Sequence, residues 1–152
     1  MNIENYNHQI NESVKFHEAD LMGICNNAVY FNYFEDARIK YLQDLKKNFK
    51  LKEVMEKESF FIMAHNECDY MEPALFDDDL IVHTRVDFIK NTSFGFRHIV
   101  ENAKTKRIHA KGGGVFVHIN IKTKVPLPLP DEFYEAVKQY EKQVNILSNN
   151  KE

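Results

Sequence analysis

The strongest constraint on the fold is a change in the spacing of apolar residues partway along the chain. Between Asn27 and about Lys47 the apolar side chains recur every three or four positions, which places them on one face of an α-helix. After Ser59 they recur at every second position, which is typical of a strand with one buried face. No repeat or low-complexity tract interrupts the chain. This pattern predicts a single unit in which a helix packs against a sheet.

The helical pattern extends from Asn27 to about Lys47. Its apolar positions form one stripe, which consists of Tyr30, Tyr33, Phe34, Ala37, Tyr41 and Leu45. Asp36 precedes Lys40 by four residues, the order of charges that stabilises a helix. Asn26 or Asn27 is placed to cap the first exposed amides. The sequence therefore predicts one long helix here, with a shorter helical piece over residues 51–57.

Alternating apolar residues predict five strands. The first two run over Ile10–His17 and Phe60–Tyr70, and the others follow around residues 80–89, 94–97 and 115–121. Turn-like segments at residues 90–93 and 103–106 separate the later strands. One strand, one long helix and four strands in hairpin succession predict an α+β fold with an antiparallel sheet. Residues 130–144 begin with Pro-Asp and predict a C-terminal helix.

Length and composition limit the remaining possibilities. The 152 residues suit a single domain spanning residues 1–152. A net charge of −3 makes duplex nucleic acid an unexpected partner. Cys25 and Cys68 lack the spacing of a metal site or a redox motif, so we expect reduced thiols and a cytoplasmic protein. No apolar run approaches the roughly 18 residues of a membrane-spanning helix, so no membrane span is expected.

A polar cluster over residues 16–27 lies where the first strand ends and the long helix begins. A helix start presents unpaired N–H groups and a partial positive charge, which can polarise a carbonyl oxygen. Asp20 lies a few residues upstream of these donors. A carboxylate beside a polarised carbonyl has what acyl transfer to water requires. The alternative interpretation is that Asp20 and Glu18 are loop carboxylates that help to cap the helix.

Other kinds of site receive less support from the sequence. No serine lies in a G-x-S-x-G motif, and the seven histidines include no H-E-x-x-H pair, so we expect no metal. Gly112–Gly114 lies within a strand and lacks the features of a phosphate loop. It marks either close packing against the helix or the passage of a thin ligand chain. Basic residues on the strand half form either a solvated face or a site for a nucleotide phosphate.

With these features in place, the sequence resembles a known family. Residues 14–42, which include Asp20, Gly23 and the helix start, resemble the opening signature of hotdog-fold acyl-CoA thioesterases of the 4-hydroxybenzoyl-CoA thioesterase type. This type includes the tol-pal-associated and long-chain acyl-CoA thioesterases. Residues 68–80 and 125–131 resemble later segments of the family. The resemblance implies a five-stranded antiparallel sheet wrapped around a central helix, homodimers joined at their sheet edges, and active sites at the dimer interface.

The resemblance also implies roles for individual residues. Asp20 matches the catalytic carboxylate, and the amides of Asn27 and Ala28 match those that polarise the thioester carbonyl. Further substrate contacts are expected from Gly23, Tyr30, Lys90, Ser93 and Lys111. Coenzyme A is part of the expected acyl-CoA substrate, so no separate cofactor is expected.

The sequence departs from the family pattern at several positions. Ile24 and Asn27 occupy places where the family often has histidine, and Ala19 replaces a threonine. Glu35 matches a glutamate on the family's helix, and we interpret it, together with Arg38, as structural.

The sequence leaves three functional hypotheses. The first is hydrolysis of an acyl-CoA, with Asp20 as general base or as nucleophile. The second is a dimeric module that binds acyl groups or coenzyme A without turnover. The third is a thioesterase that takes its substrate from an acyl carrier protein. The nature of the acyl group and the choice between homodimer and homotetramer stay open at this stage.

Overall fold

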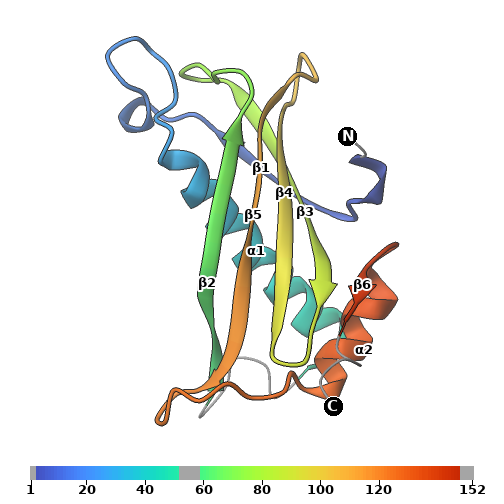
Figure 1. The fold of residues 1–152 in the computed structure, drawn as a ribbon. Coiled ribbons are helices and arrows are strands. Elements are labelled where there is room, and N and C mark those ends of the chain that lie inside the picture. The colour runs from blue at the N-terminus through green and yellow to red at the C-terminus, as the bar shows by residue number, and fades with distance from the viewer. Residues whose placement is uncertain (1–2, 52–58, 148–152) are drawn as a thin grey trace.

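Five long antiparallel strands form one sheet in the computed structural model, which describes residues 3–51 and 59–147 (Figure 1). The order across the sheet is β1-β3-β4-β5-β2. The strands are β1 (His8–Ser13), β2 (Ser59–Tyr70), β3 (Asp79–Ile89), β4 (Ser93–Asn102) and β5 (Ile108–Asn120). A short strand, β6 (Asn145–Ile146), pairs in parallel with the end of β3. The predicted α+β class and the five-stranded antiparallel sheet are confirmed.

The predicted hairpin succession is wrong at its first step. Strands β3, β4 and β5 are joined as hairpins, with turns at the predicted breaks. Strand β2 pairs with β5 instead of β3, in a register that places Tyr70 opposite Ala110. The chain therefore crosses from one edge of the sheet toward the other between β2 and β3. As a result, β2 and β1 form the two edges of the sheet.

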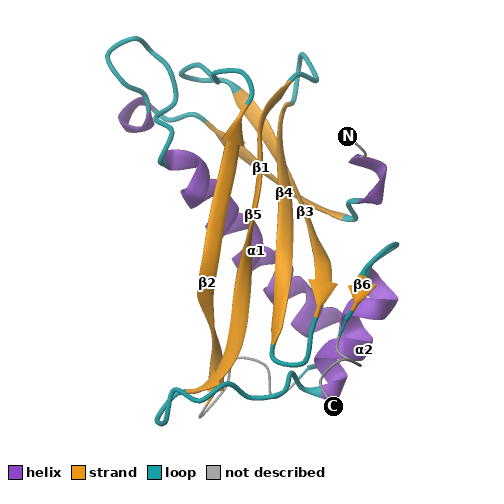
Figure 2. Cartoon of the chain, viewed as in Figure 1, coloured by secondary structure: helices purple, strands orange, loops and turns teal. Residues whose placement is uncertain are grey.

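One long helix, α1 (Val29–Phe49), lies behind the sheet and crosses its strands obliquely (Figure 2). Every residue of the predicted apolar stripe is buried. The helix begins two residues later than predicted, and its cap residue is Ala28, which forms no side-chain capping bond. The prediction that Asn26 or Asn27 caps the helix with its side chain is therefore wrong. Lys50, in the left-handed region with φ 55°, ends the helix.

The C-terminal helix α2 (Asp131–Tyr140) is shorter than the predicted 130–144 segment. Its buried residues Phe133 and Val137 join an aromatic core cluster with Phe94 and Phe96. The predicted helical piece at residues 51–57 lies, apart from the non-helical Leu51, outside the described residues. Within the described parts of the chain, no helix is long and apolar enough to cross a membrane.

The glycine run of β5 lets the helix and the neighbouring strands approach closely. A Cβ atom on Gly112 would lie 2.6 Å from a ring carbon of Phe34 on α1 and would also overlap the carbonyl oxygen of Glu67. Cβ atoms on Gly113 and Gly114 would overlap carbonyl oxygens of the flanking strands. Close packing against the helix, the first of the two interpretations of this run, is confirmed at Gly112.

Candidate active site

The segment between β1 and α1 folds into a small hairpin. Asp20 N donates to Ile24 O at 2.9 Å, and Asn26 N donates to Glu18 O at 2.8 Å. Gly23, with φ 75°, supplies the left-handed conformation that the turn requires. Cys25 N donates to Ala74 O at 2.8 Å, which ties the hairpin to the connection between β2 and β3. Asp20 is thereby held at the tip of a braced loop.

The carboxylate of Asp20 is fixed through one oxygen. Its Oδ1 accepts hydrogen bonds from Met22 N at 2.9 Å and Ile24 N at 3.2 Å. Its Oδ2 has no hydrogen-bond partner among the residues that the structure describes, and the side chain is exposed. Asp20 therefore caps its own turn rather than the helix, and it keeps one oxygen for water or substrate.

Glu18 has a structural role. Its Oε1 accepts hydrogen bonds from Tyr33 OH at 2.8 Å and from Lys15 N at 2.9 Å. Because Tyr33 is buried on α1, this bond joins the loop to the helix. Of the two loop carboxylates, Glu18 is half-buried and tied to the helix, whereas Asp20 is exposed.

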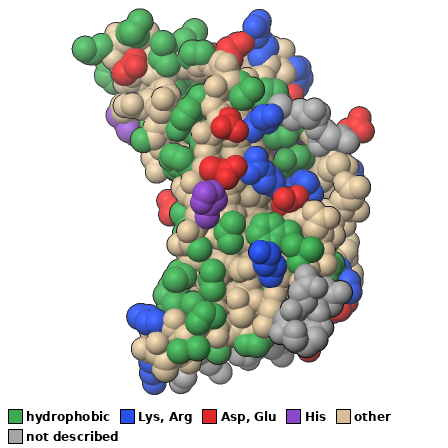
Figure 3. All heavy atoms as spheres, viewed as in Figure 1, with side chains coloured by type: hydrophobic (Ala, Val, Ile, Leu, Met, Phe, Trp, Pro, Cys, Tyr) green, Lys and Arg blue, Asp and Glu red, His purple; other side chains and the backbone are tan. Residues whose placement is uncertain are grey.

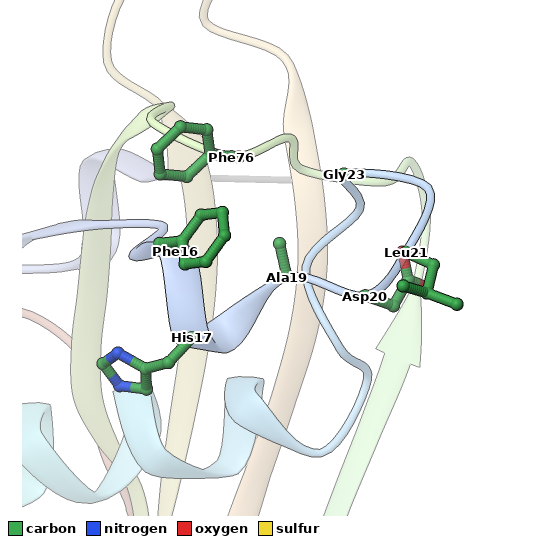
Figure 4. Close-up of a pocket in the computed structure, with 7 residues that line it drawn as sticks. All are labelled: Phe16, His17, Ala19, Asp20, Leu21, Gly23 and Phe76. Carbon is green, nitrogen blue, oxygen red and sulfur yellow. The ribbon is translucent and has the colours of Figure 1, made fainter.

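A hollow of about 630 Å³ lies beside Asp20 (Figure 4). It is lined by Phe16, His17, Ala19, Asp20, Leu21, Gly23 and Phe76. The ring centroids of Phe16 and Phe76 lie 5.8 Å apart in an edge-to-face arrangement. Ala19 lies between these two rings and Asp20 (Figure 4). Hydrophobic side chains gather on this projecting loop in Figure 3, where Phe16 and Leu21 are 82% and 107% exposed. A concave apolar surface with one fixed polar group is typical of ligand sites.

The start of α1 lines a second, smaller hollow of about 180 Å³. Asn27, Tyr30 and Tyr70 form part of its wall. Within the described chain, the N–H groups of Asn27 and Ala28 have no acceptor, whereas Val29 N donates to Asn26 O. A helix of 21 residues adds the partial positive charge of its dipole at this point. The helix start can therefore receive an oxygen that carries negative charge.

The other predicted contact residues lie farther from Asp20. Lys90 and Ser93 form the turn between β3 and β4, at the opposite end of the sheet from the Asp20 loop (Figure 1). Lys111 lies within β5, between Asp69 and Ile99. One chain thus brings Asp20 together with Gly23, and Asn27 and Ala28 together with Tyr30. It does not bring Lys90 or Ser93 to either hollow.

Sequence reasoning missed the aromatic lining of the site. Phe16 and Phe76 are separated by 60 residues in the sequence, and the structure brings their rings into contact in the lining of the hollow. An exposed phenylalanine within a polar loop was the signal available for Phe16. Cys25 is buried in the same loop, and desolvation raises the pKa of its thiol. Cys25 is therefore a poor nucleophile at neutral pH, in contrast to the exposed Asp20 carboxylate.

Comparisons with known proteins identify the family to which this fold belongs. The model of the thioesterase-like superfamily matches residues 14–137. Acyl-CoA thioesterase YbgC of Haemophilus influenzae is 32% identical over 84 residues, which are 55% of this chain and 60% of that protein. A thioesterase of Thermus thermophilus, crystallised with coenzyme A and Zn, is 29% identical, with a TM-score of 0.74 over 92% of this chain and 98% of that one. The PA5185 protein of Pseudomonas aeruginosa shares the fold at 23% identity, with a TM-score of 0.78 over 93% and 96% of the two chains.

Proposed function

The chain is a hotdog-fold member of the thioesterase-like superfamily, and we propose that it hydrolyses an acyl-CoA thioester to a free carboxylic acid and coenzyme A. The observation that carries this proposal is the Asp20 carboxylate at the wall of an apolar hollow, with Oδ1 fixed and Oδ2 free. Names of similar proteins support the reaction class, since they include an acyl-CoA thioesterase and a thioesterase bound to coenzyme A.

The proposed chemistry uses Asp20 and the helix start together. As general base, Asp20 accepts a proton from water while the water oxygen forms a bond to the thioester carbon. The carbonyl oxygen becomes an oxyanion, which the free amides of Asn27 and Ala28 stabilise. The C–S bond then breaks, and the departing thiolate of coenzyme A takes up a proton. In the alternative route, an Asp20 carboxylate oxygen attacks the thioester carbon, the C–S bond breaks and releases the thiolate of coenzyme A, and water hydrolyses the resulting anhydride.

This chemistry requires the thioester to lie along the hairpin between the two hollows. Asp20 is at the hairpin tip, and Asn27 follows its base. An apolar acyl group would occupy the hollow beside Phe16 and Phe76. Lys90 and Ser93 belong to the opposite end of the same chain, so a role for them in binding coenzyme A requires a second copy. We therefore propose that the active form is a homodimer or a higher homo-oligomer.

A second candidate function is binding of acyl-CoA without turnover. Ile24 favours it, because this residue provides no imidazole at the place where the resembled family often has histidine. A variant of the first candidate is a thioesterase whose thioester donor is an acyl carrier protein.

Release of free thiol from a panel of thioesters distinguishes these functions. The panel contains short-chain, long-chain and aromatic acyl-CoAs and one acyl group on an acyl carrier protein. We expect thiol release from at least one acyl-CoA. Thiol release from the carrier protein alone would change the proposed donor. No release from any thioester, together with thermal stabilisation by coenzyme A, would contradict the hydrolase and establish the binding module.

A further inference from the structure

Tyr70, the last residue of β2, donates a hydrogen bond from its hydroxyl to Asn27 O at 3.2 Å. Strand β2 ends at the end of the sheet where α1 begins (Figure 1), so this bond joins segments that are 43 residues apart in the sequence. Desolvation raises the pKa of Tyr70, so the hydroxyl keeps its proton at neutral pH. Tyr70 is therefore a hydrogen-bond donor in the wall of the smaller hollow.

The Tyr70 ring is held in place from two sides. Its centroid lies 5.6 Å from that of the Tyr30 ring, on the first turn of α1. Tyr30 OH in turn accepts a hydrogen bond from Ala74 N at 3.4 Å. On the strand side, Met71 N donates to His109 O at 2.8 Å, which extends the pairing of β2 with β5 by one residue. The Tyr70 hydroxyl therefore has a defined position relative to the helix start.

The carbonyl that Tyr70 contacts belongs to the central peptide of a β-turn. Val29 N donates to Asn26 O at 3.0 Å, which closes a turn with Asn27 and Ala28 at its centre. Ala28 has φ −66° and ψ −24°, near the values for the third residue of a type I turn. The closing bond of such a turn gives its central peptide no partner. Among the described residues, the Tyr70 hydroxyl is the hydrogen-bond partner of this peptide.

The same peptide carries the N–H of Ala28. A trans peptide is planar, and its N–H and C=O point in opposite directions. A hydrogen bond that fixes the direction of Asn27 O therefore also fixes the direction of Ala28 N–H. Donation to the carbonyl oxygen polarises the peptide as well, which makes its N–H a stronger donor. Rotation of this peptide by about 180° would convert the turn to type II and reverse the N–H.

We propose that Tyr70 is a positioning residue, whose hydroxyl orients and polarises the Asn27–Ala28 peptide so that Ala28 N–H stabilises the oxyanion. This inference rests on the proposed hydrolysis and adds to it a side chain that acts through the backbone of the helix start. Ala28 contributes to the same orientation, since its Cβ disfavours the positive φ that a type II turn requires. The hydroxyl and the Cβ thus restrict one peptide by independent means.

Tyr70→Phe removes the hydroxyl and keeps the ring, which is 44% exposed. We expect kcat for thiol release to fall about five- to twentyfold, less than the hundredfold or more for loss of a whole oxyanion donor. KM and the thermal midpoint are expected to stay unchanged, because the bond acts on the transition state. Unchanged kcat, a rise in KM alone, or a loss of folded protein that matches the loss of activity would overturn the proposal.

Tyr6→Phe is the matched control for this variant. The Tyr6 ring packs against His83 and lines neither hollow. Its hydroxyl has no hydrogen-bond partner in the described parts of the chain. We therefore expect wild-type kcat and KM from Tyr6→Phe.

The double variant Ala28→Gly/Tyr70→Phe tests whether both constraints act on the same peptide. Glycine adopts positive φ readily, so Ala28→Gly permits the rotated peptide that Tyr70 still opposes. We expect the double variant to lose at least about threefold more kcat than the product of the two single losses. Losses that simply multiply would show that Tyr70 acts elsewhere and would overturn the proposal.

The chemical shift of the Asn27 carbonyl carbon, measured by NMR, is a readout that requires no turnover. We expect Tyr70→Phe to move this resonance and that of the Ala28 amide nitrogen, because the hydrogen bond polarises their shared peptide. Tyr6→Phe is expected to move neither. An inactive wild type that shows these shift changes would contradict the hydrolysis and support the orienting role of Tyr70. Unchanged shifts, in an active or an inactive protein, would overturn that role.

Discussion

At the scale of single residues, Glu141 is the group whose ionisation most affects the docking of α2. Its carboxyl follows the last turn of α2 and is buried against β3. It accepts hydrogen bonds from Tyr41 OH and from Val86 N, the latter at 3.0 Å. Burial raises the pKa of Glu141 from 4.5 to about 7, although both hydrogen bonds and Arg85 oppose the shift. The folded state therefore favours the neutral acid.

This raised pKa predicts a loss of stability as the pH rises. A pKa that is higher in the folded state gives stability that is fully present below pH 4.5 and is lost as the pH passes through about 7. Glu141→Gln cannot ionise and keeps an oxygen that accepts the same bonds. We expect its free energy of unfolding, measured by urea titration, to decrease less than that of the wild type between about pH 5.5 and 8.

Glu12 adds a second contribution in the same direction, since burial and Asp36 raise its pKa to about 7. The Glu141→Gln variant is therefore expected to reduce the pH dependence and not to abolish it. Identical pH profiles for wild type and variant would contradict the assignment to Glu141.

The sequence located the candidate catalytic residue but not its bonding. Asp20 is a candidate because it precedes the start of a helix, and this position can be read from the neighbouring residues in the sequence. The bonds from Met22 and Ile24 to its Oδ1 depend on the turn at Gly23, whose geometry the residue types alone do not determine. The same limit applies to Glu18, which pairs with Tyr33 at a distance of 15 residues along the chain. Such pairings become visible once the loop is folded onto the helix.

At the scale of elements, the contact between α1 and β5 depends on the absence of a side chain at Gly112. A Cβ atom there would overlap the backbone of β2 and lie 2.6 Å from the Phe34 ring. Backbone atoms of a paired strand cannot move aside, so Gly112→Ala is expected to destabilise the fold by about 1–3 kcal/mol or more.

Gly23→Ala is the matched comparison for this prediction. A Cβ atom added to Gly23 would meet no other atom within 4 Å. Its φ of 75° would, however, strain the backbone of an alanine at this position. We expect Gly23→Ala to lower the free energy of unfolding by only about 1 kcal/mol. Chemical denaturation of both variants gives the comparison. An equal or smaller loss for Gly112→Ala would show that the helix can shift away from the sheet.

Periodicity predicted which elements form and which faces they bury, but not which strands become neighbours. The spacing of apolar residues in α1 and in β3 predicts which face of each element is buried, because this spacing is a property of each segment alone. The pairing of β2 with β5 joins segments about 50 residues apart, and no local pattern distinguishes it from pairing with β3. The burial of Arg38 on α1 likewise depends on the folded structure and is not evident from the local sequence.

At the scale of the whole molecule, the candidate site occupies one end of the sheet and is open on the protein surface. The Asp20 loop, the connection from β2 to β3 and the start of α1 meet there, whereas the turn with Lys90 and Ser93 lies at the other end. The exposed apolar side chains of the loop extend beyond what one chain covers. A complete site with coenzyme A contacts is therefore expected in an assembly of copies.

The Asp20→Asn variant tests whether the Asp20 carboxylate performs the proposed chemistry. Asparagine retains an oxygen for the bonds from Met22 and Ile24, so the loop is expected to keep its shape. We expect kcat/KM for thiol release from the best acyl-CoA to fall at least about a hundredfold, with the thermal midpoint and oligomeric state unchanged. Asp69→Asn, an exposed carboxylate on β2, is the control and is expected to keep wild-type activity. Near wild-type turnover by Asp20→Asn would contradict the proposed role of Asp20.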